Sequence, residues 1–564
     1  MSLNGSLQIA GTTLQAMQVG LQVVGNNIAN ANTPGYVREQ VVYVPAPLSR
    51  SQGMAVGMGV QTAGIVQSID RFVEERLRDA GGDRAAAEAV EDAYADLETI
   101  LSELSDTDVS TLMTSFFNSV DEVLNEPESL AIRGLAVQSG LTLANSLNTL
   151  NRRVEAVYQD FAGKVDLLGS EINTLSDEIR KLNLAIVQLE GGGGNSEAGG
   201  LRSTRQSALN RLAEIADVRT FETSTGSVNV SVGGAYLVYE GTRNEVAVLK
   251  SADDGLLKAT VTFADGSSPL RVSKGELQGV YEARDRVVGG FLSRLDEFAG
   301  ALAFEFNKVH SRGQGMSGFA EVQSTERVSD VFAPLDEAGL AFTPVSGSFE
   351  LLLYNRETKL TKTTTVVVDL NGLDGDASLS SLAAQLDAVD GVVAEVTGNN
   401  RLRIAAESSE TELGFGGDNS GLLAALGINT FFTGSRARDL AVNAVLQADV
   451  AKFAAATDGI GVGSANAEQL VALFDRGVDS LNGGPIGGFY DQLVGETARG
   501  ATAAKAVAEG LRTFEGSLEA KALAVSGVNI DEEAIDLIML QRTYQAAAKY
   551  VATLSELLEL LISL

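Results

Sequence analysis

Apolar residues at the C-terminal end of the chain recur at alternating steps of three and four positions. These positions are occupied by Leu537, Leu540, Tyr544, Ala547, Val551, Leu554, Leu558 and Leu561. A repeat of about 3.5 residues predicts a helix that packs along a second helix in a supercoil. Asn529 can cap the start of this helix, and Glu532 follows three residues later, as in a capping box. Residues 526–564 therefore predict a long terminal helix with one continuous apolar seam.

The N-terminal end of the chain carries a matching seam. Its residues are Leu3, Leu7, Ala10, Leu14, Met17, Leu21, Val24 and Ile28. Burying one leucine side chain contributes about 1.5–3 kcal/mol, so both seams are expected to find partners. Two interpretations are open. The ends pair as an ordinary helical core, or they form the assembly surface of a polymer, and periodicity alone favours the first.

A polar segment that contains Asn27 is expected to end the first helix, and a turn at Thr33-Pro34-Gly35-Tyr36 follows. Pro34 fixes φ at the first turn position, and Gly35 accepts the positive φ that a type II turn requires next. Thr33 precedes a proline and is therefore disfavoured in a helix. Residues 36–44 then predict a short strand. The expected order is helix, turn and strand.

Helical patterns dominate between the two ends, and β patterns interrupt them in two places. One apolar seam extends from Leu147 to Leu189, and a β hairpin is expected near residues 225–240. Residues 320–435 are rich in threonine and valine, with one helix expected between their strands. The predicted fold class is mostly α with β-rich insertions: paired terminal coiled-coil helices, a long helical bundle and an inserted β-rich (α+β) domain. The predicted domains are 1–60 with 500–564, 61–319 with 436–499, and 320–435.

Charge and composition exclude several classes of function. The chain has 564 residues with 42 basic and 74 acidic side chains, and its net charge of −32 would repel a nucleic acid backbone. It has no cysteine, which excludes disulfides, thiolate zinc sites and cysteine nucleophiles. No window of about 18 apolar residues predicts a membrane span. The first charged residue is Arg38, so the basic start of a secretory signal is missing.

Candidate chemical sites are few. The acidic stretch with Asp369, Asn371, Asp374 and Asp376 does not supply the ligands of an EF-hand at the required positions. The glycines at 459–463 are not followed by the Lys-Ser/Thr of a phosphate loop. His310, the single histidine, is expected in the last turn of a helix, with a surface or capping role rather than a catalytic one. No catalytic constellation, cofactor site or metal site is predicted, which favours an assembly protein over an enzyme.

Two stretches resemble the signatures of rod, hook and hook-associated proteins of the bacterial flagellum. They are NNIANANTPGYVREQ at 26–40 and SGVNIDEEAIDLIMLQRTYQAAAKYVATLSELLELLISL at 526–564. The second has the form typical of the FlgK family of hook-associated proteins. Residues 201–218, 226–238 and 275–313 resemble internal parts of the same family more loosely.

This resemblance implies a structural adaptor that polymerises at the distal end of the hook and joins hook to filament. The implied partners are further copies of the chain, the hook protein, the next junction protein on the filament side, and an export chaperone that binds the C-terminal helix. The implied location is the extracellular hook–filament junction, reached from the cytoplasm by the flagellar type III route without a cleaved signal. The expected assembly residues are Leu3, Leu7, Leu14, Met17, Leu21, Val24, Asn27, Ile28, Pro34, Gly35, Tyr36, Leu537, Leu540, Tyr544, Val551, Leu554, Leu558 and Leu561.

Other functions stay open at this point. A hook protein or a distal rod protein shares the N-terminal signature and a similar C-terminus. A surface-binding module on a polymeric stalk is a different class, with the β-rich insertion as its binding part. An enzyme grafted into the insertion is a third class, but residues 320–435 contain no histidine and no cysteine.

Overall fold

The computed structural model describes the backbone of residues 3–51, 54–103, 108–191, 197–253, 255–266, 268–373, 375–481 and 483–563. Within these ranges the side chains of residues 4, 49–51, 54–56, 103 and 561–563 lie outside the description. Contacts along the chain group it into two compact units. The first unit comprises residues 1–93, 159–284 and 502–564, and the second comprises 94–158 and 285–501.

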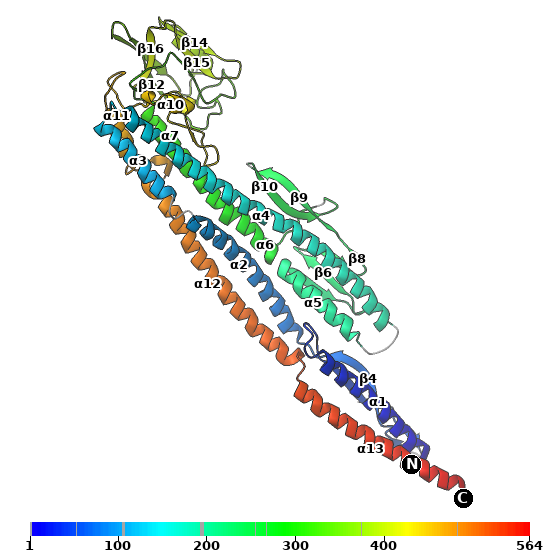
Figure 1. Ribbon diagram of the computed structural model, residues 1–564. Coiled ribbons are helices and arrows are strands. Elements are labelled where there is room, and N and C mark those ends of the chain that lie inside the picture. Colours follow the sequence, from blue (N-terminus) through cyan, green and yellow to red (C-terminus); the bar gives the residue numbers. More distant parts are fainter. Residues whose placement is uncertain are drawn as a thin grey trace. The chain divides into compact units, whose positions relative to one another are not determined.

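The two ends of the chain meet in the first unit as a pair of long helices, α1 (Leu3–Asn30) and α13 (Ile530–Ser563). Figure 1 shows α1 and α13 side by side, with the N- and C-termini close together. After α1, strand β1 (Glu39–Pro45) pairs with β4 (Val60–Gln67) in an antiparallel ribbon. A short pair, β2 (Ser49–Ser51) and β3 (Met54–Val56), lies between them in the sequence.

The rest of the first unit combines parts of long helices with small antiparallel sheets. Its helices are part of α2 (Arg71–Glu103), part of α4 (Leu130–Glu190), α5 (Gly199–Ile215), α6 (Glu276–Glu282) and part of α12 (Ile486–Ser526). Its sheets are β5 (Val218–Glu222), β6 (Val228–Val232), β7 (Ala235–Tyr239) and β8 (Thr242–Arg243), and the pair β9 (Val246–Asp253) and β10 (Leu256–Phe263). The hairpin expected near 225–240 is present as β6 and β7.

Two asparagines on α4 attach these sheets to the helix. The side-chain amide of Asn183 donates to the Val228 carbonyl oxygen at 2.7 Å and accepts from the Val228 amide at 3.0 Å. Asn173 makes the same pair of bonds with Val246, at 2.7 and 2.9 Å. In each case the amide side chain completes the hydrogen bonding of one strand residue, so the start of the strand is fixed on the helix.

The second unit has an aromatic core between helices. It contains the remaining parts of α2, α4 and α12 and most of the π-helical turn η2 (Ala283–Val288), together with α3 (Val109–Asn125), α7 (Gly289–His310) and α11 (Ala465–Ala472). The rings of Phe116, Phe306, Phe431 and Phe432 lie within 6 Å of one another between centroids. Their burial joins α3 and α7 to the segment that follows the β-rich insertion.

The β-rich insertion of the second unit has two three-stranded antiparallel sheets and its own apolar core. One sheet has the order β11 (Glu321–Gln323), β15 (Leu402–Ala406), β14 (Val392–Val396), and the other β13 (Thr361–Val368), β12 (Gly347–Asn355), β16 (Thr411–Gly416). Helix α8 (Leu379–Asp387) starts with a capping box between Ser378 and Ser381. The prediction of a mainly helical chain with β-rich insertions is thereby confirmed, and the sequence-based domain limits stay predictions.

The chain leaves the insertion through short elements that cover the end of α7. They are α9 (Leu422–Leu426), β17 (Phe432–Thr433), β18 (Ala441–Val442), α10 (Ala444–Ala448), η3 (Val450–Lys452) and, after α11, η4 (Asp479–Leu481). His310 is consequently fully buried, and the expected surface role is wrong. The returning segment packs over the last turn of α7, and a contact between residues so far apart in sequence leaves no local signal.

Candidate assembly interface

The pair of terminal helices buries the middle of both seams. Ala16, Met17, Val24 and Leu540 form a small core, and neighbouring side chains pack against it: Leu21, Ile28, Val60 and Leu537. Gly20 lies in this contact, because a Cβ atom there would come within 3.1 Å of the Leu540 side chain. The two helices therefore approach closely near Gly20.

The other seam residues follow this contact toward the chain ends. Leu554 is buried, with 6 % of its side chain exposed, whereas Tyr544 is 38 % exposed. The half-buried seam residues are Leu3, Leu7, Leu14, Val551 and Leu558. The side chain of Leu561 lies outside the described part of the structure. The two seams thus bury part of each other's apolar surface within one chain.

A buried polar cluster closes the upper end of the helix pair, where α1 ends and α13 begins. Asn27 is its centre: its side-chain amide donates to the Glu533 carboxylate at 3.0 Å and to the Glu39 carbonyl oxygen at 2.9 Å. The Asn27 carbonyl oxygen accepts from the Tyr36 hydroxyl at 2.9 Å and from the Glu39 amide at 3.0 Å. All four hydrogen-bonding positions of the Asn27 amide are therefore occupied.

The Glu533 carboxylate in this cluster is paired with Arg38. Glu533 is only 1 % exposed, and its Oε1 lies 2.7 Å from Nε of Arg38. The backbone amide of Arg38 also donates to the Ser526 carbonyl oxygen at 2.9 Å, at the end of α12. A buried carboxylate requires such a partner, because an unpaired charge away from water is strongly destabilising. Arg38 thus ties β1 to the start of α13.

The Tyr36 hydroxyl stays protonated at neutral pH. Burial, together with the carboxylates of Glu39 and Glu533, raises the pKa of Tyr36 to about 12. The hydroxyl can therefore donate to Asn27 over the whole physiological range.

The predicted turn residues divide into two groups. Asn27 and Tyr36 enter the cluster, whereas Pro34 and Gly35 are exposed and shape the turn that delivers Tyr36. Gly35 has φ of +74°, in the left-handed region that glycine accepts most readily. The Tyr36 amide closes the turn with a bond of 3.2 Å to the Thr33 carbonyl oxygen.

Two central members of the cluster were missed by the sequence reasoning. Glu533 lies in the acidic first turn of α13, which by itself indicates only a helix start, and Arg38 was noted only as the first charged residue. Their pairing joins positions almost 500 residues apart, for which a single sequence carries no signal.

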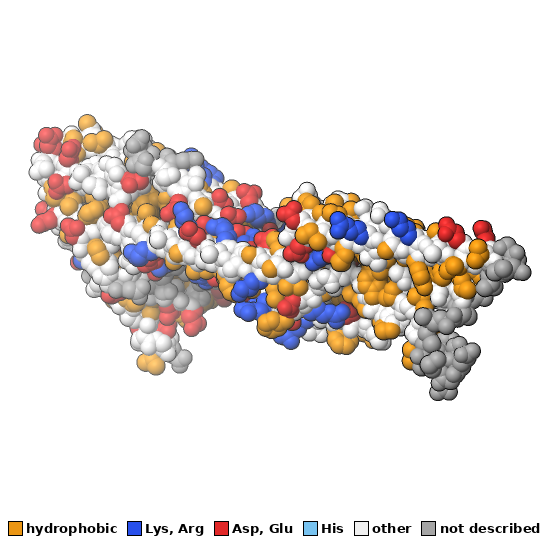
Figure 2. All heavy atoms as spheres, turned by 90° about the horizontal axis from the view of Figure 1, so that it is seen from below, with side chains coloured by type: hydrophobic (Ala, Val, Ile, Leu, Met, Phe, Trp, Pro, Cys, Tyr) orange, Lys and Arg blue, Asp and Glu red, His pale blue; other side chains and the backbone are white. Residues whose placement is uncertain are grey.

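A second row of exposed apolar side chains lies on α13 outside the seam. This outer row consists of Ile535, Ile538, Met539 and Leu557, which are 66, 50, 57 and 49 % exposed. With about 100° of rotation per residue, Ile535 and Ile538 fall on the side of the helix opposite Leu540. Met539 and Leu557 lie at the edge of the seam. Figure 2 shows hydrophobic side chains gathered on the surface near the chain ends. A helical projection of the sequence would have shown this row, which the search for one 3.5-residue seam passed over.

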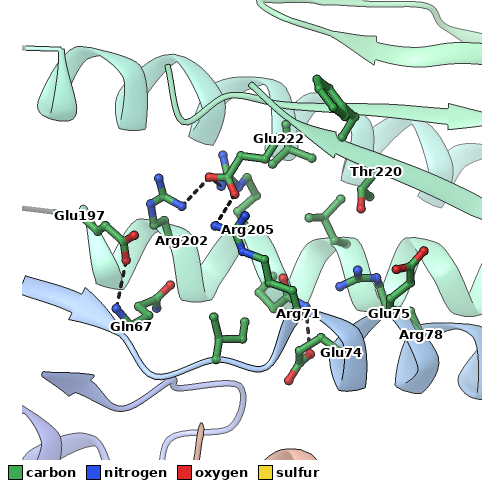
Figure 3. Close-up of a pocket in the computed structure, with 15 residues that line it drawn as sticks. Gln67, Arg71, Glu74, Glu75, Arg78, Glu197, Arg202, Arg205, Thr220 and Glu222 are labelled. Atoms are coloured by element: carbon green, nitrogen blue, oxygen red, sulfur yellow. Dashed lines mark hydrogen bonds and ion pairs between the residues drawn. The ribbon is translucent and has the colours of Figure 1, made fainter. Parts of the chain in front are cut away.

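A polar cavity of about 540 Å³ lies elsewhere in the first unit, between the start of α2, α5 and β5 (Figure 3). The Glu222 carboxylate in its wall is paired with arginines. Glu222 lies 3.0 Å from Arg71 and 2.6 Å from Arg202, and 3.7 Å from Arg205. Opposite charges therefore balance in the cavity wall, which gives it a structural role.

The described residues offer no group of three or more histidine, aspartate or glutamate side chains that could hold a metal ion. In the acidic stretch considered for calcium, the Asp376 carboxylate accepts from the backbone amides of Asn371 and Gly372. It therefore stabilises its own turn, and Asp374 lies outside the described residues. Among the described helices, none has the length and apolar character needed to cross a membrane.

Replacing Leu554 by aspartate is expected to release the lower half of the helix pair. The substitution removes a buried leucine and places an unpaired carboxylate against α1, at a combined effect of about 4 kcal/mol. Hydrogen–deuterium exchange should speed up at least about a hundredfold in residues 5–14 and 545–558. Leu21→Asp should act in the same way. Unchanged protection of these segments in both variants would refute the pairing, and exchange in the second unit serves as the internal control.

Three family models match separate parts of the chain. The flagellar hook-associated protein FlgK helical domain matches residues 94–323. The flagella basal body rod protein model matches residues 7–36, and the C-terminal model of flagellar basal body rod FlgEFG proteins matches residues 519–564. The two rod models cover parts of α1 and α13.

Relatives and one solved structure agree with these matches. Flagellar hook-associated protein 1 of Escherichia coli is 25 % identical over 98 % of both chains. That of Bacillus subtilis is 25 % identical over 55 % of this chain and 68 % of its own. The flagellar hook junction protein FlgK of Burkholderia pseudomallei has a similar fold, with a TM-score of 0.50 and 13 % identity over 80 % of this chain and all of that one. Together these findings show that the chain is similar to flagellar hook-associated protein 1 along nearly its whole length, and to flagellar rod proteins at both of its ends.

Proposed function

We propose that this protein is a structural adaptor of the bacterial flagellum, which assembles at the distal end of the hook and joins hook to filament. The observation that carries the proposal is the helix α13, which is apolar on two opposite faces. One face is covered by α1 within the chain, and the outer row is exposed to water. An exposed apolar surface of this kind is typical of a protein–protein interface.

The outer row suits contacts between copies of the chain. A surface on one copy that binds a different surface on the next produces rings or helical tubes, according to the rotation between copies. In this proposal the paired ends, residues 1–60 with 500–564, form the assembly domain. The partners above and below the ring are the hook protein and the next junction protein on the filament side.

The same outer row also explains a need for protection before assembly. Exposed apolar helices associate non-specifically at high concentration. We therefore include an export chaperone that covers the C-terminal helix while the chain is cytoplasmic. Export then follows the flagellar type III route, and the protein acts outside the cell without catalysis.

Electron microscopy of cells that lack this protein tests the proposal. We expect hooks of normal length without filaments, and filament subunits lost to the medium. Restoring the gene should restore the filaments. Cells without any hook would move the role of the protein to the hook or rod, and cells with intact filaments would refute a junction role.

A further inference from the structure

The two terminal seams match each other in more than one register. The hydrogen bond between Asn27 and Glu533 and the approach of Gly20 to Leu540 define an antiparallel pair. Counting from these contacts, the apolar positions that come level are Leu3–Leu558, Leu7–Leu554, Ala10–Val551, Leu14–Ala547, Met17–Tyr544, Leu21–Leu540 and Val24–Leu537. Both seams therefore run in step along the whole pair.

A slip of one heptad preserves this match. We consider a slip in which α13 moves along its own axis by seven residues, so that Leu540 takes the place of Glu533. The level positions then become Leu7–Leu561, Ala10–Leu558, Leu14–Leu554, Met17–Val551, Leu21–Ala547, Val24–Tyr544 and Ile28–Leu540. The slipped register has as many apolar pairs as the observed one. Burial of apolar area alone therefore discriminates poorly between the two.

The polar cluster does distinguish the two registers. In the slipped pair, Leu540 takes the place of Glu533 beside Asn27 and Arg38. The leucine side chain accepts no hydrogen bond, so the Asn27 amide and the Arg38 guanidinium lose their shared buried partner. We propose that the buried contact of Glu533 with Asn27 and Arg38 is the determinant that fixes the register of α1 against α13. A single buried polar residue plays the same part in coiled coils, where it selects one register.

Register matters for assembly because it sets the position of the outer row. Seven residues of helix correspond to about 10 Å along the axis. A slipped α13 would shift Ile535, Ile538 and Leu557 by this distance relative to the rest of the unit. This consequence rests on the proposed function, whereas the register itself is a property of the single chain.

Engineered disulfides can report the register, because the chain has no cysteine of its own. The pair Ala10→Cys with Val551→Cys reports the observed register, and Ala10→Cys with Leu558→Cys reports the slipped one. Residues one heptad apart are too far separated for one cysteine to reach both, since a disulfide needs Cα atoms within about 7 Å. Each pair is oxidised in dilute full-length chain, and intramolecular links are counted by mass spectrometry.

With Glu533 present, we expect the Val551 reporter to link and the Leu558 reporter to stay almost unlinked. Glu533→Ala should raise linking of the Leu558 reporter about tenfold or more. Glu533→Gln keeps acceptor atoms for Asn27 and Arg38, and it should retain the observed register. Glu532→Ala is the matched control, because Glu532 also faces Arg38, at 3.6 Å, but is 60 % exposed.

Three results would overturn the proposal. The first is that the Glu533→Ala variant forms only the disulfide of the Val551 reporter, in the same yield as the chain with Glu533. The second is loss of both links in Glu533→Ala, which would make the cluster a stabilising contact only. The third is the absence of the Val551 link with Glu533 present. Slipping in the isolated chain, together with normal filaments in cells, would keep the register role and refute its consequence for assembly.

Discussion

Ile538→Asp is expected to abolish assembly without unfolding the chain. Half of the Ile538 side chain is exposed, so the substitution should change the free energy of unfolding by about 0.5 kcal/mol or less. In the assembled state the same side chain would be buried against a neighbouring copy, where an unpaired carboxylate is strongly unfavourable. Cells with this variant should export filament protein to the medium and carry bare hooks.

Gln541→Asp provides the matched control for this prediction. Gln541 is exposed on the same helix, but it lies between the seam and the outer row. The Gln541→Asp substitution adds the same charge at almost the same position along α13, and filaments should form normally. Normal filaments with Ile538→Asp, at equal levels of protein, would show that the outer row is not an interface. Circular dichroism of both purified variants checks that the helices are retained.

The terminal seams were predictable because burial repeats in step with the helix. Steps of three and four mark one side of a helix, and Met17, Val24, Leu540 and Leu554 are indeed buried there. The turn at Gly35 was equally local, since its positive φ follows from two adjacent residues. Local patterns of this kind also gave the helical character of the chain and its β-rich insertions.

The polar cluster was beyond such reasoning for a physical reason. Asn27 and Glu533 acquire their roles only when two helices from opposite ends of the chain meet. Each residue by itself has an ordinary local explanation, as a helix-ending asparagine or as acidic charge in a first turn. The outer row was missed for another reason. The apolar seam alone was enough to predict the helix, so the apolar residues outside the seam, Ile535 and Ile538, were not examined as a separate pattern.

The burial of His310 also depends on residues distant in the sequence, and it leads to a second prediction, on the pH dependence of stability. Nδ1 of its ring donates to the Asn429 carbonyl oxygen at 2.9 Å, and Nε2 accepts from the Ala454 amide at 3.1 Å. This pair of bonds requires the neutral ring, protonated on Nδ1 alone. Burial lowers the pKa of His310 to about 4, and the Arg133 cation contributes to the lowering.

We therefore expect the second unit to lose stability between pH 6.5 and 4. Above pH 6.5 the ring is neutral in the folded and unfolded chain, so its contribution is fully present. Below this value His310 is protonated in the unfolded chain, whereas in the folded chain it stays neutral down to about pH 4. Each pH unit in this window then removes about 1.4 kcal/mol of unfolding free energy, or about 3 kcal/mol in total.

The difference between the native chain and His310→Gln isolates this effect. Glutamine retains one donor and one acceptor but does not titrate. Burial raises the pKa of Asp296 and of Glu326 in the same unit, so these groups stabilise the fold as pH falls and act in the opposite direction in both proteins. Urea unfolding is followed at pH 7, 6, 5 and 4 by pulse deuterium labelling of peptides from residues 300–316. The native chain should lose about 3 kcal/mol relative to His310→Gln over this series. A difference that stays constant with pH would mean that the buried ring accepts a proton as readily as a free one, contrary to the hydrogen bond from Ala454.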